Sequence, residues 1–195
     1  MSPRPVVFLD RDGTLVHDAH YLSRPEQLRL LPGVPAALGK LRDAGLALVV
    51  VTNQSGIGRG WFTEDDFAAV TRALDAMLSA EGITLLATYH CPDAPDVPES
   101  ETCRKPSPLL YERAAREHGL DLKASFYVGD RWRDVAPAVR FGATGILVPN
   151  AETPYQELLK ARDDALVSTT LGAAADRIVR TLVQRAAPAD GEGAA

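Results

Sequence analysis

The sequence predicts an α/β fold: a doubly wound parallel sheet with helices on both faces and no large cap domain. Short apolar runs alternate along the chain with segments of helical periodicity, which is typical of repeated strand–helix units. The apolar runs contain few polar residues, as expected of parallel strands that are buried on both faces. The connections between them leave no room for another domain, so we expect one layered sheet.

Six short runs are expected to form the strands of this sheet. The runs at 6–9 and 46–51 consist of apolar residues alone, which favours burial of both faces. Together the expected strands are 6–9, 46–51, 83–89, 125–128 and 145–148, with a short strand around 165–167. Glycine, proline and charged residues mark 13–32, 55–60 and 90–107 as loops.

The expected helices repeat apolar residues at helical spacing. They span 35–44, 63–78, 108–118, 135–141, 155–162 and 171–186. Gly45 and Gly119 follow two of them as stop signals, and Thr63 with Asp66 forms a weak variant of a capping box. Pro137 is expected in the first turn of its helix, where a missing backbone N–H costs little.

Length and composition predict one domain over residues 1–186. The chain has 195 residues, of which 46% are hydrophobic, and this is enough for a sizeable core. The last segment, 187–195, contains only alanine, glycine, proline and acidic residues, so we expect it to be a disordered tail.

Net charge and cysteine content limit the classes of partner and the cellular compartment that we expect. The net charge of −5 argues against binding to nucleic acid or to anionic membranes. No apolar stretch approaches the length of a membrane span, and the start of the sequence shows no signal-peptide pattern. With only two cysteines, a disulfide framework is not expected and a reducing compartment is the default. We therefore expect a cytoplasmic protein, and a monomer.

Two aspartates follow the first predicted strand. Asp10 and Asp12 lie where this strand ends, at the sheet edge at which ligands bind in open α/β proteins. Residues two apart in an extended chain point to the same side, and two carboxylates there repel each other unless a cation or a proton lies between them. The pattern suggests a magnesium site beside a carboxylate nucleophile. A plain Asp-Gly turn is the alternative.

Other polar residues follow other strands of the predicted sheet. Thr52 ends the second strand, Asp130 follows the fourth, and Asp134 comes four residues later. Lys105 lies in the loop after the third strand. Each alone is as well explained by a turn or a solvated charge, but together with the aspartates of the first motif they place several carboxylates, a hydroxyl and an ammonium around one crevice.

These residues carry a family resemblance that spans roughly residues 6–148. The segment Asp10–Thr14 reads DRDGT, and Gly129–Asp134 has the form GDxxxD. Together with Thr52 and Lys105, these motifs resemble the haloacid dehalogenase superfamily of phosphotransferases. The resemblance implies a Rossmann-like phosphatase domain that depends on magnesium.

Longer matching segments indicate which branch of the superfamily this sequence resembles. Segments 8–14, 52–60 and 103–106 resemble the heptose 1,7-bisphosphate 7-phosphatases, which act on a small phosphorylated sugar, and histidinol-phosphate phosphatases share much of the pattern. Polynucleotide 3′-phosphatases share the first motif and a Thr-Asn-Gln strand end, although the acidic net charge counts against DNA. A non-catalytic phosphoacceptor domain would also use an aspartate, a hydroxyl and a lysine.

The resemblance implies a role for each matched residue. Asp10 would attack phosphorus and form an aspartyl-phosphate, while Asp12 would protonate the leaving oxygen and then activate water. Asp10, the backbone carbonyl of Asp12, and Asp130 would hold magnesium, with Asp134 as an indirect ligand. The two remaining groups, Thr52 and Lys105, would bind the non-bridging phosphoryl oxygens.

Substrate-binding residues are less sharply marked. Asn53, Arg59 and Arg104 are polar or basic and lie beside the motifs. By resemblance, Arg104 would receive a second phosphate of the substrate, for which the fork of a guanidinium is suited. A solvated surface arginine is the alternative.

The loop before Lys105 departs from the pattern of close relatives, which carry structural zinc on a C-x-H pair and a C-x-C pair. Here the first pair reads Cys91 and Asp93, and the second Glu101 and Cys103. Closed structural zinc sites are mostly built from cysteine and histidine. Zinc is therefore doubtful in this chain.

Overall fold

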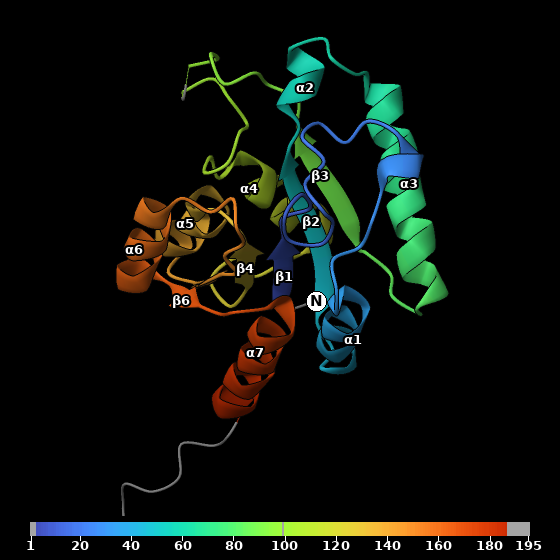
Figure 1. Cartoon of the computed structure of the whole chain (residues 1–195). Helices are drawn as coiled ribbons and strands as arrows, with labels where there is room; N and C mark the ends of the chain where they lie inside the picture. The colour runs from blue at the N-terminus through green and yellow to red at the C-terminus, as the bar shows by residue number, and fades with distance from the viewer. Residues whose placement is uncertain (1–2, 99, 187–195) are drawn as a thin grey trace, which may run out of the picture.

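A computed structural model describes residues 3–98 and 100–186. Its six strands form one parallel sheet in the order β3-β2-β1-β4-β5-β6 (Figure 1). The strands are β1 (Val6–Leu9), β2 (Ala47–Asn53), β3 (Ala87–Cys91), β4 (Phe126–Gly129), β5 (Thr144–Leu147) and β6 (Leu166–Val167). Because β1 lies in the middle and the chain winds outward from it on both sides, the predicted doubly wound fold is confirmed.

The described residues also form seven α-helices and one short 3-10 helix, which lie between the strands or, for the last helix, after β6. They are η1 (Pro25–Gln27), α1 (Val34–Asp43), α2 (Ser55–Gly58), α3 (Glu64–Ala80), α4 (Leu109–His118), α5 (Trp132–Phe141), α6 (Tyr155–Asp164) and α7 (Leu171–Ala186). None of the helices in the described part of the chain has the length and apolar character that crossing a bilayer requires. The predicted tail, 187–195, lies outside the described residues.

Alternate residues of β1 divide the core between the two faces of the sheet. Val7 and Leu9 pack in one cluster with apolar residues of α1, α3 and α7. Val6 and Phe8 point the other way and pack with residues of α4 and α5. Helices therefore cover both faces, which is why the strands could be read as uninterrupted apolar runs (Figure 1).

Three local predictions were wrong. The third strand begins at Ala87 instead of residue 83, because Ile83 packs into the core beside the end of α3 and does not pair with β2. Residues 55–58 of the predicted loop form α2. Helix α5 begins at Trp132, so Pro137 lies inside the helix and not in its first turn.

The register of the sheet sets the position of the site. Leu9 of β1 pairs with Val50 of β2 and with Val128 of β4, so the carboxyl ends of the three central strands lie close together. Asp10 continues this alignment, since its backbone N–H donates to the carbonyl of Val128 over 2.9 Å. The first motif is thereby fixed at the sheet edge.

Candidate active site

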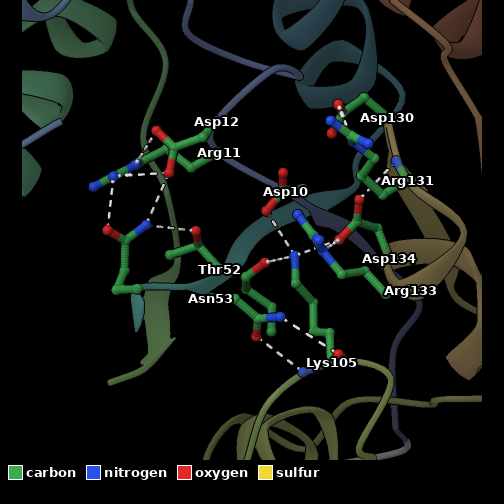
Figure 2. A network of polar contacts seen from close by, with 12 residues as sticks. Asp10, Arg11, Asp12, Thr52, Asn53, Lys105, Asp130, Arg131, Arg133 and Asp134 are labelled. Atoms are coloured by element: carbon green, nitrogen blue, oxygen red, sulfur yellow. Dashed lines mark hydrogen bonds and ion pairs between the residues drawn. The ribbon is translucent and has the colours of Figure 1, made fainter. Parts of the chain in front are cut away.

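A buried lysine joins two carboxylates at this edge. Lys105 Nζ lies 2.6 Å from Asp10 Oδ1 and 2.7 Å from Asp134 Oδ1 (Figure 2). It also donates to the backbone carbonyl of Val51 over 2.7 Å. All three charged side chains are almost fully buried. The predicted meeting of Asp10, Lys105 and Asp134 is therefore present in the structure.

Burial dominates the protonation of this cluster. It raises the pKa of Asp10 to about 7, against the opposing charge of Lys105 and with the added repulsion of Asp134 and Asp130. Burial and the charge of Asp134 raise the pKa of Asp130 to about 6. For Lys105, burial lowers the pKa, but Asp10 and Asp134 outweigh it and keep the pKa above its ordinary value. One lysine does not neutralise the whole cluster.

The carboxylates of Asp10, Asp130 and Asp134 are arranged as a cation site. One oxygen from each lies within 4.8 Å of the others. Asp130 Oδ1 is buried and has no hydrogen-bond partner among the described residues, so one acidic oxygen is left uncompensated. An all-oxygen set of this kind fits Mg²⁺, which prefers carboxylates and retained water.

Asp12 differs from the sequence expectation, because its carboxylate does not belong to this cluster. The chain leaves the strand after Leu9, so the same-side rule for an extended segment does not apply to Asp10 and Asp12. The carboxylate of Asp12 instead accepts hydrogen bonds from Arg11 (Figure 2) and from Gln54. Gln54 also donates to Thr52 Oγ1 over 2.9 Å.

Asn150 is a site residue that sequence reasoning missed. Its Nδ2 donates to Asp130 Oδ2 over 2.9 Å and to the backbone carbonyl of Gly13 over 3.1 Å. It therefore ties the loop of the first motif to that of the fourth. Asn150 follows β5 closely, so the rule that selected polar residues at strand ends could also have selected it.

Asp134 is oriented by the helix that carries it. It is the third residue of α5, and its Oδ2 accepts the backbone N–H of Arg131 over 2.9 Å. A side chain at Gly129 would collide with Asp134, so glycine is required for this close approach. The GDxxxD spacing thus brings Asp134 back over the strand end to Lys105.

A cavity of about 310 Å³ opens beside the cluster. Asp10, Asp12, Thr52 and Asp130 line it, together with the predicted substrate-binding residues Asn53, Arg59 and Arg104 and with residues that were not predicted to bind substrate, Asp18, His20, Tyr21, Arg131 and Arg133. This cavity brings residues from every motif except Lys105 to one surface, and Lys105 lies beneath it against Asp10.

The predicted substrate-binding residues differ in what they contact. Asn53 is already engaged, since its Oδ1 accepts the backbone N–H of Lys105 over 2.9 Å. Arg59 lies over the Trp61 ring, with 5.0 Å between its guanidinium carbon and the ring centroid. Burial and the nearby charges of Arg133 and Arg59 lower the pKa of Arg104, so these guanidinium groups lie close together beside the cavity.

The loop before Lys105 is closed by a Cys91–Cys103 disulfide, which contradicts the expectation that the two cysteines stay reduced. They are 12 residues apart in sequence, but the end of β3 and the loop that returns toward β2 bring them together. Asp93 Oδ2 lies 3.2 Å and 3.3 Å from the two sulfur atoms. In this form neither sulfur is a thiolate, the state that zinc requires.

The parallel sheet and the acidic cluster at its edge define a phosphatase of the haloacid dehalogenase type. The HAD-hydrolase-like family model matches residues 102–174. The D-glycero-beta-D-manno-heptose-1,7-bisphosphate 7-phosphatase of Yersinia pestis is 44% identical over 140 residues, which cover 69% of this chain and 74% of that protein. The chain belongs to the heptose 1,7-bisphosphate 7-phosphatase branch of the haloacid dehalogenase superfamily.

Another relative and a solved structure carry names of the same kind. The D-glycero-beta-D-manno-heptose-1,7-bisphosphate 7-phosphatase of Escherichia coli (strain K12) is 38% identical over 170 residues, covering 84% of this chain and 89% of that protein. Among solved structures, the D,D-heptose 1,7-bisphosphate phosphatase from B. bronchiseptica, complexed with magnesium and phosphate, has a TM-score of 0.79 at 31% identity. The match covers 93% of this chain and 99% of that one.

Proposed function

We propose that this protein removes the 7-phosphate of D-glycero-D-manno-heptose 1,7-bisphosphate through an aspartyl-phosphate, with magnesium as cofactor. The observation that supports this proposal most directly is the cluster of Asp10, Lys105, Asp130 and Asp134 beside the cavity. The names of relatives support the substrate, and they include both the beta and the alpha anomer. The proposal therefore specifies the 7-phosphate and leaves the anomer open.

Asp10 is the proposed nucleophile. Lys105 Nζ contacts its Oδ1 over 2.6 Å, which leaves Oδ2 to form the bond to phosphorus as the bond to the sugar oxygen breaks. Asp12 gives a proton to that oxygen and later takes one from the water that hydrolyses the intermediate. Thr52 would contact a non-bridging oxygen, and Lys105 would contact another by exchanging one of its three present acceptors for it.

Asp10 and Asp130, with the backbone carbonyl of Asp12, would hold the magnesium ion, and Asp134 would support it indirectly. Bound there, the ion supplies positive charge that offsets the phosphoryl oxygens. Asn150 keeps Asp130 oriented for this task. Doubt about structural zinc stands, because Asp93 and Glu101 occupy two of the ligand positions.

The guanidinium groups that line the cavity form the proposed recognition site for the rest of the substrate. Arg59 and Arg104 both line the cavity, and Arg104 is the candidate for the phosphate that does not react. Asn53 also lines the cavity, although its amide oxygen accepts the backbone N–H of Lys105. We further propose that the protein acts in the cytoplasm as a monomer on a small phosphorylated sugar, and not on nucleic acid or a membrane.

A substrate panel tests the proposal. Heptose 1,7-bisphosphate, histidinol phosphate and a 3′-phosphorylated oligonucleotide would each be assayed with magnesium and with a chelator. We expect the highest kcat/KM for the heptose bisphosphate, and no turnover after chelation. A higher kcat/KM for either rival would overturn the substrate assignment without affecting the reaction class.

A further inference from the structure

Arg11, Gln54 and Asp12 form a closed ring of hydrogen bonds. Arg11 donates from Nε to Asp12 Oδ1 over 3.1 Å and from Nη2 to Asp12 Oδ2 over 2.8 Å (Figure 2). Gln54 Nε2 donates to Asp12 Oδ2 over 2.8 Å, and Gln54 Oε1 accepts from Arg11 Nη2 over 3.0 Å. Each member of the ring therefore contacts both of the others.

The ring determines which way the amide of Gln54 faces. A guanidinium has only donors, so the amide oxygen of Gln54 must face Arg11 and the amide nitrogen must face Asp12. That nitrogen carries two hydrogens. One goes to Asp12, and the other goes to Thr52 Oγ1 over 2.9 Å. The Thr52 hydroxyl thus acts as acceptor toward Gln54, and its own proton is left for another partner.

Both supporting side chains are held firmly. Arg11 is 1% exposed and Gln54 is 4% exposed. The guanidinium carbon of Arg11 lies 5.4 Å from the centroid of the Phe67 ring. Burying a cation is costly unless it is paired, and Asp12 is the carboxylate that pairs with Arg11 within the described residues. The pair therefore has little freedom to rearrange.

We propose that Arg11 and Gln54 are positioning residues for phosphoryl transfer. Arg11 fixes the amide of Gln54, and Gln54 uses one donor to hold Asp12 and the other to turn the Thr52 proton toward the phosphoryl group. This inference rests on the proposed role of Asp12 as acid and base. A single amide thereby aligns the proton donor and the phosphoryl contact.

Two esters with different leaving groups separate these effects. An alkyl phosphate such as glycerol phosphate needs a proton on its departing oxygen, whereas the more acidic alcohol of p-nitrophenyl phosphate leaves with little help. The measured quantity is kcat/KM, which reports the steps up to loss of the alcohol. Misplacing Asp12 slows only the alkyl ester, while misplacing the Thr52 proton slows both.

The main variant is Gln54→Met, which keeps the size of the side chain and removes its hydrogen bonds. We expect kcat/KM to fall about 100-fold with the alkyl ester and about tenfold with the aryl ester. Arg11→Lys should show the same larger loss with the alkyl ester, because an ammonium lacks the planar pair of donors that contacts both Asp12 oxygens. Gln27→Met is the matched control, since Gln27 also makes side-chain hydrogen bonds but does not line the cavity.

Gln54→Leu is the second variant, and the Tm of both variants is measured so that kcat/KM is compared on folded protein. Leucine also removes the hydrogen bonds to Asp12 and Thr52, without placing a second carboxylate 2.8 Å from Asp12 Oδ2, so the same ester preference is expected. If both Gln54 variants lose the same factor in kcat/KM with the two esters, while Asp12→Asn loses more with the alkyl ester, then Gln54 does not position Asp12. Equal losses in Asp12→Asn itself would overturn its acid role and this inference with it.

Discussion

Lys105 Nζ contacts Asp10 Oδ1 over 2.6 Å, although the two residues are 95 positions apart in the sequence. The lysine comes from the loop between β3 and α4, and the aspartate comes from the end of β1. Because a third partner, Asp134, lies on the other side of the ammonium, removal of Lys105 leaves two buried carboxylates facing each other.

Lys105→Met should destabilise the fold as well as abolish activity. Breaking a buried ion pair by removing one partner typically costs about 3–5 kcal/mol, because the remaining charge is uncompensated. Chemical unfolding at neutral pH measures this cost. Lys40→Met is the control: Lys40 pairs with Asp176 on the surface, where loss of the pair costs about 0–1 kcal/mol. A similar small cost for both variants would contradict the buried pair.

Magnesium should stabilise the protein more at high pH than at low pH. The pKa of Asp10 is raised to about 7 and that of Asp130 to about 6, so between about pH 4 and pH 7 the metal-free folded state binds more protons than the unfolded state. Stability without metal therefore falls as pH rises through this range. A cation requires the ionised carboxylates, so its binding displaces these protons.

Thermal unfolding with and without magnesium at about pH 5 and about pH 8 measures this dependence. We expect the rise in Tm on adding magnesium to be larger at the higher pH. The variant Asp130→Asn should show a small rise at both. An equal or larger rise in the acidic buffer for the wild type would refute the linkage.

Asp10→Asn should abolish turnover and leave the fold intact. The amide is a poor nucleophile, and replacing a charged group by a neutral one of the same size relieves repulsion from Asp130 and Asp134. Initial rates and the Tm of the variant are the measurements. Near-normal rates would remove Asp10 as the nucleophile.

Asp12→Asn should slow both halves of the reaction, by roughly 10²–10⁴-fold, because one group serves as acid and then as base. Rapid-quench trapping of the phosphoenzyme separates its formation from its breakdown. If the trapped intermediate hydrolyses at the wild-type rate, Asp12 is not the base of the second step.

The double variant Cys91→Ser with Cys103→Ser should lower the free energy of unfolding by about 3 kcal/mol, since the loop that the disulfide closes is short. Wild-type protein with added reductant is the control and should lose a similar amount. Thiol titration and metal analysis of protein purified without chelator complete the test. Two free thiols with one equivalent of zinc would show that the loop is held by metal and not by the disulfide.

Much of the site followed from one rule, that polar residues at the carboxyl ends of parallel strands share an edge. This rule brought together Asp10, Lys105 and Asp134 from three separate stretches, and the structure confirms their contacts. The same rule could have included Asn150. It could not find Arg11 and Gln54, because nothing in the sequence indicates that two polar side chains beside the motifs turn inward as a pair.

The sequence by itself determined the order of strands and helices and the residues that reach the sheet edge, because burial on both faces imposes apolar runs that end in polar groups. Only the tertiary structure decided which charges meet. The carboxylate of Asp12 turned toward Arg11 and away from the acidic cluster, and Cys91 met Cys103, because these contacts depend on how the loops fold over the edge. Loop paths are set by packing between distant segments, which local sequence patterns do not encode.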